Sequence, residues 1–310
     1  MTNNRLCFVA VVVAALVMVG ALEPAAAQGP QRRFGTPEEA ARVLVEAART
    51  GDTEALSAIL GPKGKEIISS GDEVQDRRAR EDFAVAAGEA MVLNRPAANR
   101  VVVAVGKDYW PFPIPVVKDA SGWRFDTEAG REEILNRRIG RNELRAIESC
   151  EAYVAAQREY ASAVREADGV LKFAQQIVSD PGRRNGLYWE ADEADEESPL
   201  GPLIAAAVAE GRKLAKPGSP PAPYHGYLFK VVKAQGPNAP GGAYGYVING
   251  HMVAGFALVA WPAQYGASGI MTLVVNQNGV VYEKDLGAKT AEIAARITRY
   301  DPDRSWRKAQ

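Results

Sequence analysis

The sequence predicts an α+β protein with two domains, each built from helices packed on an antiparallel sheet. Three observations predict this class. Helical segments with an apolar stripe are followed by short strand-like runs twice along the chain. Turn residues at 119–122 and 277–279 join successive runs as hairpins, which makes those strands antiparallel. The 310 residues suffice for two domains of roughly 100–200 residues each.

The first 27 residues predict export across a membrane. Residues 1–5 are weakly basic, residues 6–22 are almost wholly apolar, and the small residues that a signal peptidase needs lie at 25–27. A membrane anchor needs about 20 consecutive apolar residues, whereas this run is shorter and contains Gly20. We therefore expect a cleaved bacterial signal peptide and a mature chain that is periplasmic or secreted, with no stable membrane span.

After a leader at 28–35, the expected N-terminal domain covers residues 34–127. Its first helix begins at Thr36, which can cap it, and Glu39 has the position of a capping-box carboxylate. Further helices are expected after Asp52 and over residues 76–90. The strand-like runs lie at 100–105, 111–118 and 122–126. The second run carries three prolines, which cannot donate ladder hydrogen bonds, so it is expected to lie at a sheet edge or to start late.

The expected C-terminal domain covers residues 128–300 and is followed by a tail at 301–310. It opens with the longest helical segment, 128–166, in which Gly140-Arg141-Asn142 is a candidate break with Asn142 capping the second half. Further helices are expected at 170–178, 203–210 and 288–299. The strand-like runs lie at 227–234, 252–260, 270–276 and 280–284.

Composition and motifs argue against several classes of protein. The formal net charge of −1 argues against nucleic acid as an obligate partner. Nucleophile elbow, phosphate loop, dinucleotide fingerprint and zinc-protease helix are missing from the sequence. His225, His251 and, after cleavage, Cys150 are too few to supply the four ligands of a structural zinc site. We expect no metal and no cofactor, and we interpret Cys150 as a buried structural residue because apolar residues lie at helical spacing from it.

Two groups of side chains are candidates for ligand binding, and no residue is assigned a catalytic role. The aromatic candidates for a binding cleft are Trp189, Tyr224, Tyr244 and Trp261. Aromatic residues beside Gly or Pro can equally plug loops. The second group lies on the charged face of the long helix, where Arg137, Arg138 and Arg141 can grip an anionic ligand. The alternative is that acids and arginines on this face pair with one another in solvent.

Long motifs are spread over nearly the whole mature chain. They are WPFPIP (110–115), EEILNRRIGRNEL (132–144), AQREYA (156–161), GLYW (186–189), SPLGPL (198–203), QGPNAPGGAY (235–244) and GFALVAWPAQYG (255–266). On these motifs the chain resembles the DUF2950 family of exported bacterial proteins. This resemblance implies no particular activity, cofactor or catalytic residue.

Two weaker resemblances concern architecture. The runs GYLFKVV (226–232) and FALVAWPAQYGASGIMTLVVNQNGVVY (256–282) resemble the soluble half of pilin-like or pseudopilin-like proteins, which place an antiparallel sheet against one long helix. After cleavage this chain departs from them in having no membrane-embedded N-terminal helix. The first domain resembles small exported domains of the NTF2-like or cystatin-like kind, which implies a pocket between helix and curved sheet.

We expect a non-enzymatic binding or interaction module of the cell envelope, whose partner is an unidentified envelope protein or a small ligand. The absence of catalytic motifs and the many rigid, aromatic-rich loops favour recognition over chemistry. Two alternatives stay open. One is a carboxylate-dependent hydrolase of envelope polysaccharide or peptide, and the other is a structural component of an envelope assembly.

Overall fold

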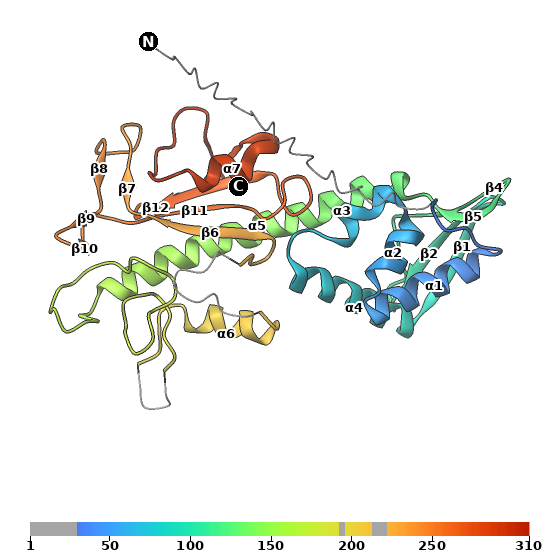
Figure 1. Ribbon diagram of the computed structural model, residues 1–310, viewed down its shortest axis with the longest axis horizontal. Helices are drawn as coiled ribbons and strands as arrows, with labels where there is room; N and C mark the ends of the chain where they lie inside the picture. The colour runs from blue at the N-terminus through green and yellow to red at the C-terminus, as the bar shows by residue number, and fades with distance from the viewer. Residues whose placement is uncertain (1–29, 192–195, 213–221, 310) are drawn as a thin grey trace, which may run out of the picture.

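The computed structural model describes residues 30–191, 196–212 and 222–309, and the expected signal peptide at 1–27 lies outside this part of the chain. The described chain is elongated, with one α+β unit at each end (Figure 1). Helix α5 (Thr127–Ala161) runs from the first unit into the second. The predicted α+β class with antiparallel sheets is confirmed. Because α5 contacts both units, the expected domain boundary at residue 127 stays a prediction.

The N-terminal unit packs helices on a five-stranded antiparallel sheet of order β1-β2-β4-β5, with β3 paired to β2. Its helices are α1 (Pro37–Thr50), α2 (Thr53–Leu60), η1 (Pro62–Gly64), α3 (Lys65–Ile68) and α4 (Glu73–Glu89). Its strands are β1 (Met91–Ala97), β2 (Arg100–Val105), β3 (Trp110–Pro111), β4 (Val116–Asp119) and β5 (Gly122–Phe125). Ile59, Val103 and Phe125 lie fully buried in the shared core of these helices and strands.

The boundaries of α1 follow from local hydrogen bonds that the sequence predicts. The Thr36 hydroxyl accepts the N–H of Glu39 at 3.1 Å, and the Glu39 carboxylate accepts the N–H of Gly35 at 3.0 Å. Gly51 ends the helix with a φ of 69°, a left-handed conformation that costs glycine little. Asp52 then accepts the N–H of Ala55 at 2.9 Å and caps α2.

The strands of this unit differ from the prediction in two places. β1 was not expected because its sequence, MVLNRPA, lacks β-branched alternation, and its side chains are mostly exposed in the structure. It forms instead through antiparallel pairing with β2. The expected strand at 111–118 divides into β3 and β4, because Pro113 and Pro115 supply no N–H to a ladder. β4 starts late, at Val116, and lies between β2 and β5, so the expected edge position is wrong for it.

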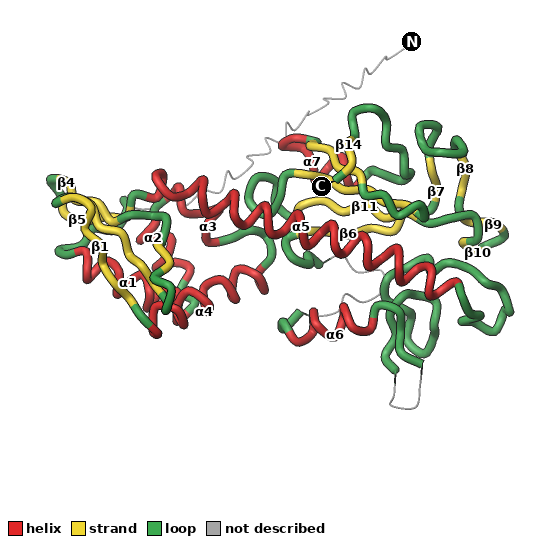
Figure 2. Tube along the Cα trace, turned by 180° about the vertical axis from the view of Figure 1, so that it is seen from behind, coloured by secondary structure: helices red, strands yellow, loops and turns green. Residues whose placement is uncertain are grey.

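The C-terminal unit packs α5 and α7 (Thr290–Ala295) on opposite faces of a five-stranded antiparallel sheet of order β14-β13-β12-β11-β6 (Figures 1 and 2). Its strands are β6 (Tyr227–Val232), β11 (Ala257–Pro262), β12 (Met271–Asn276), β13 (Tyr282–Asp285) and β14 (Arg307–Lys308). Every residue of β11 is buried, as expected where both faces of a strand are covered. Two short ribbons pair β7 (Ala234–Gln235) with β8 (Tyr244–Gly245) and β9 (Val247–Ile248) with β10 (His251–Met252).

The prediction of a helix at 170–178 is wrong, because this segment is extended. Two of its residues form isolated β-bridges, Phe173 with Met252 and Val178 with Tyr188. The amide of Gln157 explains the extended backbone between them. Its Nε2 donates to the carbonyl of Ala174 at 2.8 Å, and its Oε1 accepts the N–H of Ala174 at 2.8 Å. A side chain of α5 thus takes the place of a neighbouring strand.

The last two expected helices exist with shifted bounds. The helix expected at 203–210 is α6 (Gly201–Ala209). The helix expected at 288–299 is preceded by η2 (Gly287–Lys289) and ends early, as α7, at Ala295. There the Nζ of Lys230 donates to the carbonyl of Ala295 at 2.7 Å and satisfies an acceptor at the helix end.

Helix α5 is continuous over 35 residues, so the break at Gly140–Asn142 is absent. Asn142 is 1% exposed and makes tertiary hydrogen bonds instead of a cap. Its Oδ1 accepts from the amide of Gln75 in α4 at 2.7 Å, and its Nδ2 donates to the carbonyl of Ser268 at 2.8 Å. The next residue, Glu143, accepts two backbone N–H groups at the start of β12 at 2.9 and 3.0 Å. Side chains of α5 therefore bind both units at the place where they meet.

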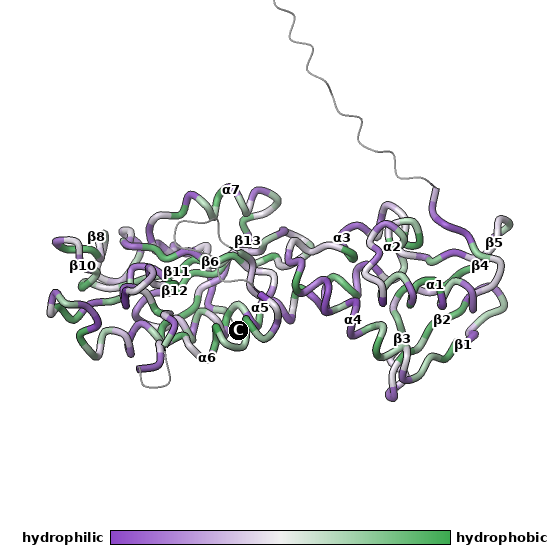
Figure 3. The backbone as a smooth tube through the Cα atoms, turned by 60° about the horizontal axis from the view of Figure 1, so that its bottom comes forward, coloured by the Kyte–Doolittle hydropathy of each residue, from purple (hydrophilic) through white to green (hydrophobic). Residues whose placement is uncertain are grey.

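The hydropathy of the residues differs between the two units and the region where they meet (Figure 3). The strands of both units are mainly hydrophobic, whereas hydrophilic residues gather where α4 lies against α5 between the units. In the parts of the chain that the structure describes, no helix is both long and apolar enough to cross a membrane.

Candidate functional site

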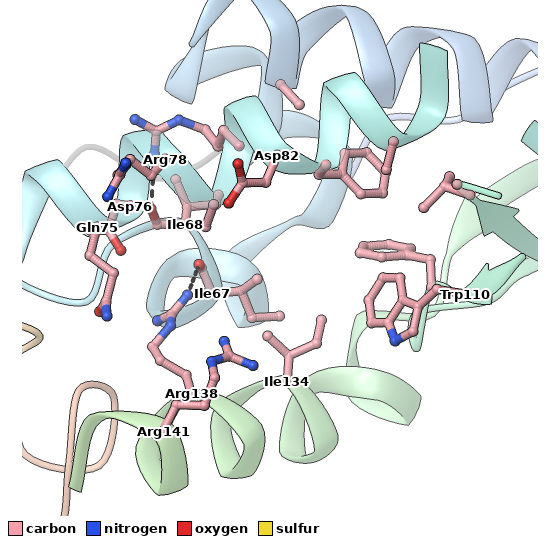
Figure 4. Close-up of a pocket in the computed structure, with 18 of the residues that line it drawn as sticks. Ile67, Ile68, Gln75, Asp76, Arg78, Asp82, Trp110, Ile134, Arg138 and Arg141 are labelled. Carbon is pink, nitrogen blue, oxygen red and sulfur yellow. Dashed lines mark hydrogen bonds between the residues drawn. The ribbon is translucent and has the colours of Figure 1, made fainter. Parts of the chain in front are cut away.

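A cavity of about 1060 Å³ lies between α4 and α5, with residues of α1, α2, α3 and β3 in its walls (Figure 4). Small-molecule sites in proteins commonly measure about 300–1,000 Å³, so this volume is at the upper end of that range. Residues 210, 212 and 225 extend the lining of the cavity to the junction of the two units.

One end of the cavity is apolar. Its walls include Leu44, Leu60, Phe83, Phe112 and Ile134. The rings of Phe83 and Phe112 pack with centroids 5.2 Å apart, so α4 and the segment after β3 close this end together. Trp110 lies next to them at the rim, with 38% of its surface exposed and its ring 6.4 Å from that of Phe112. This end can bury an apolar group of a ligand.

Arg138 forms part of the opposite, polar end. It is 8% exposed, and its guanidinium donates to the carbonyls of Glu66 and Ile67, the first of these at 2.7 Å. These carbonyls belong to the short helix α3, whose carbonyl groups lack partners within the helix. Burial lowers the pKa of Arg138, and the nearby charge of Asp76 opposes that shift. Arg138 therefore stabilises the wall of the cavity.

Arg141 lies one turn beyond Arg138 and also lines the cavity. It is exposed, and neither a hydrogen bond nor an ion pair to it is found among the described residues. In Figure 4 the side chains of Arg138 and Arg141 both rise from α5 toward α4. Arg137, one turn before Arg141 on α5, does not line the cavity. It pairs with Glu133 at 2.6 Å, and its guanidinium lies 5.8 Å from the centre of the Trp110 ring.

Two carboxylates of α4 line the same cavity, in different environments. Asp76 is 6% exposed, its Oδ2 accepts the N–H of Ser70 at 2.8 Å, and its Oδ1 has no hydrogen-bond partner. Burial raises the pKa of the Asp76 carboxyl, although the hydrogen bond from Ser70 and the charge of Arg138 oppose the shift. Asp82 is exposed, and in Figure 4 it points from α4 into the space that faces α5.

A buried ion pair holds the rim of the cavity where the two units meet. Asp72, the cap of α4, is 1% exposed and accepts from the guanidinium of Arg212 at 2.9 Å. It also accepts the N–H of Gln75 at 3.1 Å and that of Gly226 at 2.9 Å. One carboxylate thus joins the first turn of α4 to two segments of the C-terminal unit. This joint fixes the distance between the walls.

The structure does not bring the four aromatic candidates together. Trp189 and Trp261 are 6% and 5% exposed and belong to the core of the C-terminal unit. Tyr244 packs against a neighbouring tyrosine ring at 5.6 Å, on the β8 ribbon. Tyr224 lines a second cavity, of about 720 Å³, and the guanidinium of Arg212 lies 5.2 Å from the centre of its ring. Within the described chain no ring contact joins any two of the four. That they bind a ligand stays a prediction.

The histidines and the cysteine form no catalytic arrangement with one another. The closest acids are Glu210, 4.0 Å from His225, and Asp168, 3.6 Å from His251. Burial raises the pKa of the Cys150 thiol to about 12, so this cysteine is unreactive, in line with its interpretation as a structural residue. No group of three or more His, Cys, Asp or Glu residues within the described ranges could hold a metal ion.

Sequence reasoning did not place α4 at the site, although the helix itself was expected. The residues of α4 in the cavity are Gln75, Asp76, Ala79, Phe83 and Ala86, together with the charged residues between them. A signal for this face exists in the spacing of Ala79, Phe83 and Ala86 at four and three residues. The charged residues between these positions obscure the apolar pattern in the sequence.

The fold and the site define an α+β protein in which one long helix joins two units and borders a cavity with one apolar and one arginine-containing end. The model of the family described as "Protein of unknown function (DUF2950)" matches residues 31–309. The chain therefore belongs to the DUF2950 family. No curated protein and no solved structure matches it.

Proposed function

We propose that this protein is exported to the cell envelope and binds a small ligand there, without changing it chemically, in the cavity between α4 and α5. The main support for the proposal is the position of Arg141 in this cavity. This residue lines a cavity of about 1060 Å³, and among the described residues it has no acidic or hydrogen-bonding partner. A guanidinium in that position is available to a ligand that brings its own hydrogen-bond acceptors.

The walls around Arg141 support the proposal because they are held in place without a ligand. Arg138 and Asn142, its neighbours along α5, bond to α3, α4 and the segment before β12. A ligand that enters a preformed cavity loses less free energy to ordering the protein than one that must assemble its site.

The first test fills the cavity with a side chain. Ala79 lines the cavity on α4, whereas Val85 lies on the same helix, is 65% exposed and does not line it. We expect the mature protein, purified gently from envelope fractions, to carry a bound small molecule in native mass spectrometry. A79W should lose this molecule and V85W should keep it. Equal occupancy in both variants, or an empty wild-type protein under every growth condition, would contradict the proposal.

Export has its own test. The apolar run and the alanines before Gln28 support cleavage after residue 27. N-terminal sequencing of the protein recovered from an osmotic-shock fraction should start at Gln28. A chain that keeps its first residues and stays in the cytoplasmic fraction would remove the envelope from the proposal and leave the cavity to be tested separately.

A pilin-like arrangement of the C-terminal unit is also part of the proposal, and the packing of α5 along β11 and β12 supports it. The alternative of a structural role in an envelope assembly predicts self-association. Sedimentation velocity at several concentrations separates the two, because a ligand-binding monomer keeps one sedimentation coefficient and an assembly subunit does not.

A further inference from the structure

The two ends of the cavity differ in chemistry (Figure 4). Trp110 lies at one end, Arg138, Arg141 and Gln75 lie toward the other, and Ile134 lies between them. The ring of Phe112 is 6.4 Å from that of Trp110. A ligand that occupies the whole cavity therefore meets aromatic and aliphatic carbon along one part of its length and cationic side chains along the other. Such a gradient selects for a molecule that is itself polar at one end only.

Among the described residues that line the cavity, every Arg and Lys but one has an ion pair or a hydrogen bond. The ion pairs of lining cations are Arg212–Asp72 at 2.9 Å, Arg78–Glu210 at 3.3 Å, Lys107–Glu89 at 3.5 Å and Arg145–Glu148 at 3.6 Å. Arg80 and Arg138 donate to backbone carbonyls, and the charge of Asp76 lies near both. Among the described lining residues, Arg141 is the cation with neither kind of contact.

The neighbours of Arg141 add to the positive character of this end. The charges of Arg138 and Arg141 repel each other. Asp76, the buried acid of the opposite wall, has an unpartnered oxygen, and burial favours its neutral form. An anion placed at Arg141 offsets the repulsion between the two arginines and supplies the acceptor oxygens that Arg141 lacks.

We infer that the ligand of this cavity is an acidic amphiphile, with one carboxylate or phosphate head group at Arg141 and a single apolar chain directed toward Phe83, Phe112 and Trp110. This inference rests on the proposed function and adds the chemical class of the ligand. An inorganic anion leaves the apolar end empty, and a neutral lipid leaves Arg141 without acceptors. Only a molecule with both parts uses both ends.

The experiment compares matched ligands on the mature chain. Isothermal titration calorimetry below the critical micelle concentration would use decanoate, decyl phosphate, decyl maltoside and decyltrimethylammonium, with acetate and inorganic phosphate as chainless controls. We expect one site for decanoate or decyl phosphate, at least about tenfold tighter than for the neutral and cationic compounds, because a charge-assisted hydrogen bond is worth about that ratio. Comparison of the decanoate and decyl phosphate titrations distinguishes a carboxylate from a phosphate head group. The chainless anions should not bind measurably.

Three substitutions locate the head group. R141Q should lower the affinity for the acidic ligand about 10- to 100-fold, the loss expected when a hydrogen bond to a charged group is removed. R137Q is the matched control, since Arg137 lies one turn before Arg141 on α5 but pairs with Glu133 and does not line the cavity. D82N removes an exposed carboxylate that points into the same space and should tighten binding about twofold. Circular dichroism checks that each variant is folded.

The outcomes separate this inference from the proposed function. If all decyl compounds bind equally and A79W blocks them, the cavity binds ligands but the acidic head group is wrong. Equal weakening by R137Q and R141Q would overturn the assignment of Arg141. Weaker binding by D82N would mean that the head group also carries a cation, which contradicts a purely acidic amphiphile. If no decyl compound binds and native mass spectrometry finds no adduct, both the inference and the proposed function fail.

Discussion

Two glycines of α5 allow a sharp test of how this helix is positioned beside the cavity. A Cβ added at Gly130 would lie 2.4 Å from the carbonyl carbon and oxygen of Pro113 and 2.6 Å from the nitrogen of Ile114. These are backbone atoms, which cannot rotate away. A Cβ added at Gly140 of the same helix would meet nothing within 4 Å. Gly130 is therefore required for the close approach of α5 to the segment between β3 and β4, whereas Gly140 is not.

The two substitutions by alanine share one favourable contribution and differ in the other. Alanine in place of glycine stabilises a helix interior by about 1 kcal/mol at either position. Overpacking in a filled interior costs about 1–3 kcal/mol, and contact with backbone places Gly130→Ala at the upper end. We expect Gly140→Ala to raise the free energy of unfolding by about 1 kcal/mol and Gly130→Ala to lower it by about 2 kcal/mol. The difference of about 3 kcal/mol isolates the steric cost, since the gain in helix propensity cancels.

Urea unfolding followed by far-UV circular dichroism measures this difference. In thermal unfolding, each kcal/mol shifts the midpoint of a protein of about this size by roughly 2–4 °C, so the variants should differ by about 6–12 °C. The same displacement should loosen the wall that carries Trp110, and the fluorescence of Gly130→Ala should shift toward longer wavelength. Equal stability of Gly130→Ala and Gly140→Ala would refute the close approach of α5 to Pro113.

Three further predictions concern buried groups. Asp72→Ala leaves Arg212 buried without its main partner, while Glu210 remains at 3.0 Å. Because breaking a buried ion pair costs about 3–5 kcal/mol, we expect the free energy of unfolding to fall by about 3 kcal/mol. Urea titration measures this change. Burial raises the pKa of Asp76 above its ordinary value of 3.8, so the folded state holds the proton more tightly and stability falls as pH rises through the raised pKa. Asp76→Asn should flatten this fall in pH-dependent unfolding, and an unchanged slope would contradict it. The Cys150 thiol, with its pKa raised to about 12, should react with Ellman's reagent at pH 8 only after unfolding.

Local signals in the sequence were sufficient where a helix or strand is fixed by its own residues. The capping residues Thr36 and Asp52 hold the positions that their spacing predicts. The buried strand β12 follows from its continuous apolar run, whereas β11 starts at Ala257, five residues later than the expected run at 252–260. Signals failed where a distant side chain decides the local structure. The amide of Gln157 makes the segment around Ala174 extended, and no pattern within 170–178 announces it.

The candidate site shows the same limit. Sequence reasoning found Arg138 and Arg141 as candidates because they lie on one charged helix, and it grouped Arg137 with them although it faces another way. The four aromatic candidates lie apart because the sheet and loops bury Trp189 and Trp261 separately, which composition alone does not reveal. The cavity itself lies between α4 and α5, and the placement of one helix relative to another is a tertiary property that single-helix periodicity does not contain.

The joint between the units links the fold to the proposed binding. Asp72 joins α4 to Arg212 of the C-terminal unit, and Asn142 of α5 is hydrogen-bonded to Gln75 of α4. Gln75 and Arg212 also line the cavity. Any change in the angle between the units therefore alters the polar end of the cavity before it alters the apolar end. A ligand anchored at Arg141 would in turn resist such a change, because reciprocal coupling between binding and conformation is required by thermodynamics. Under the proposed function the two units act together, because Glu210, Arg212 and His225 of the C-terminal unit line the same cavity as Phe83 and Phe112 of the N-terminal unit.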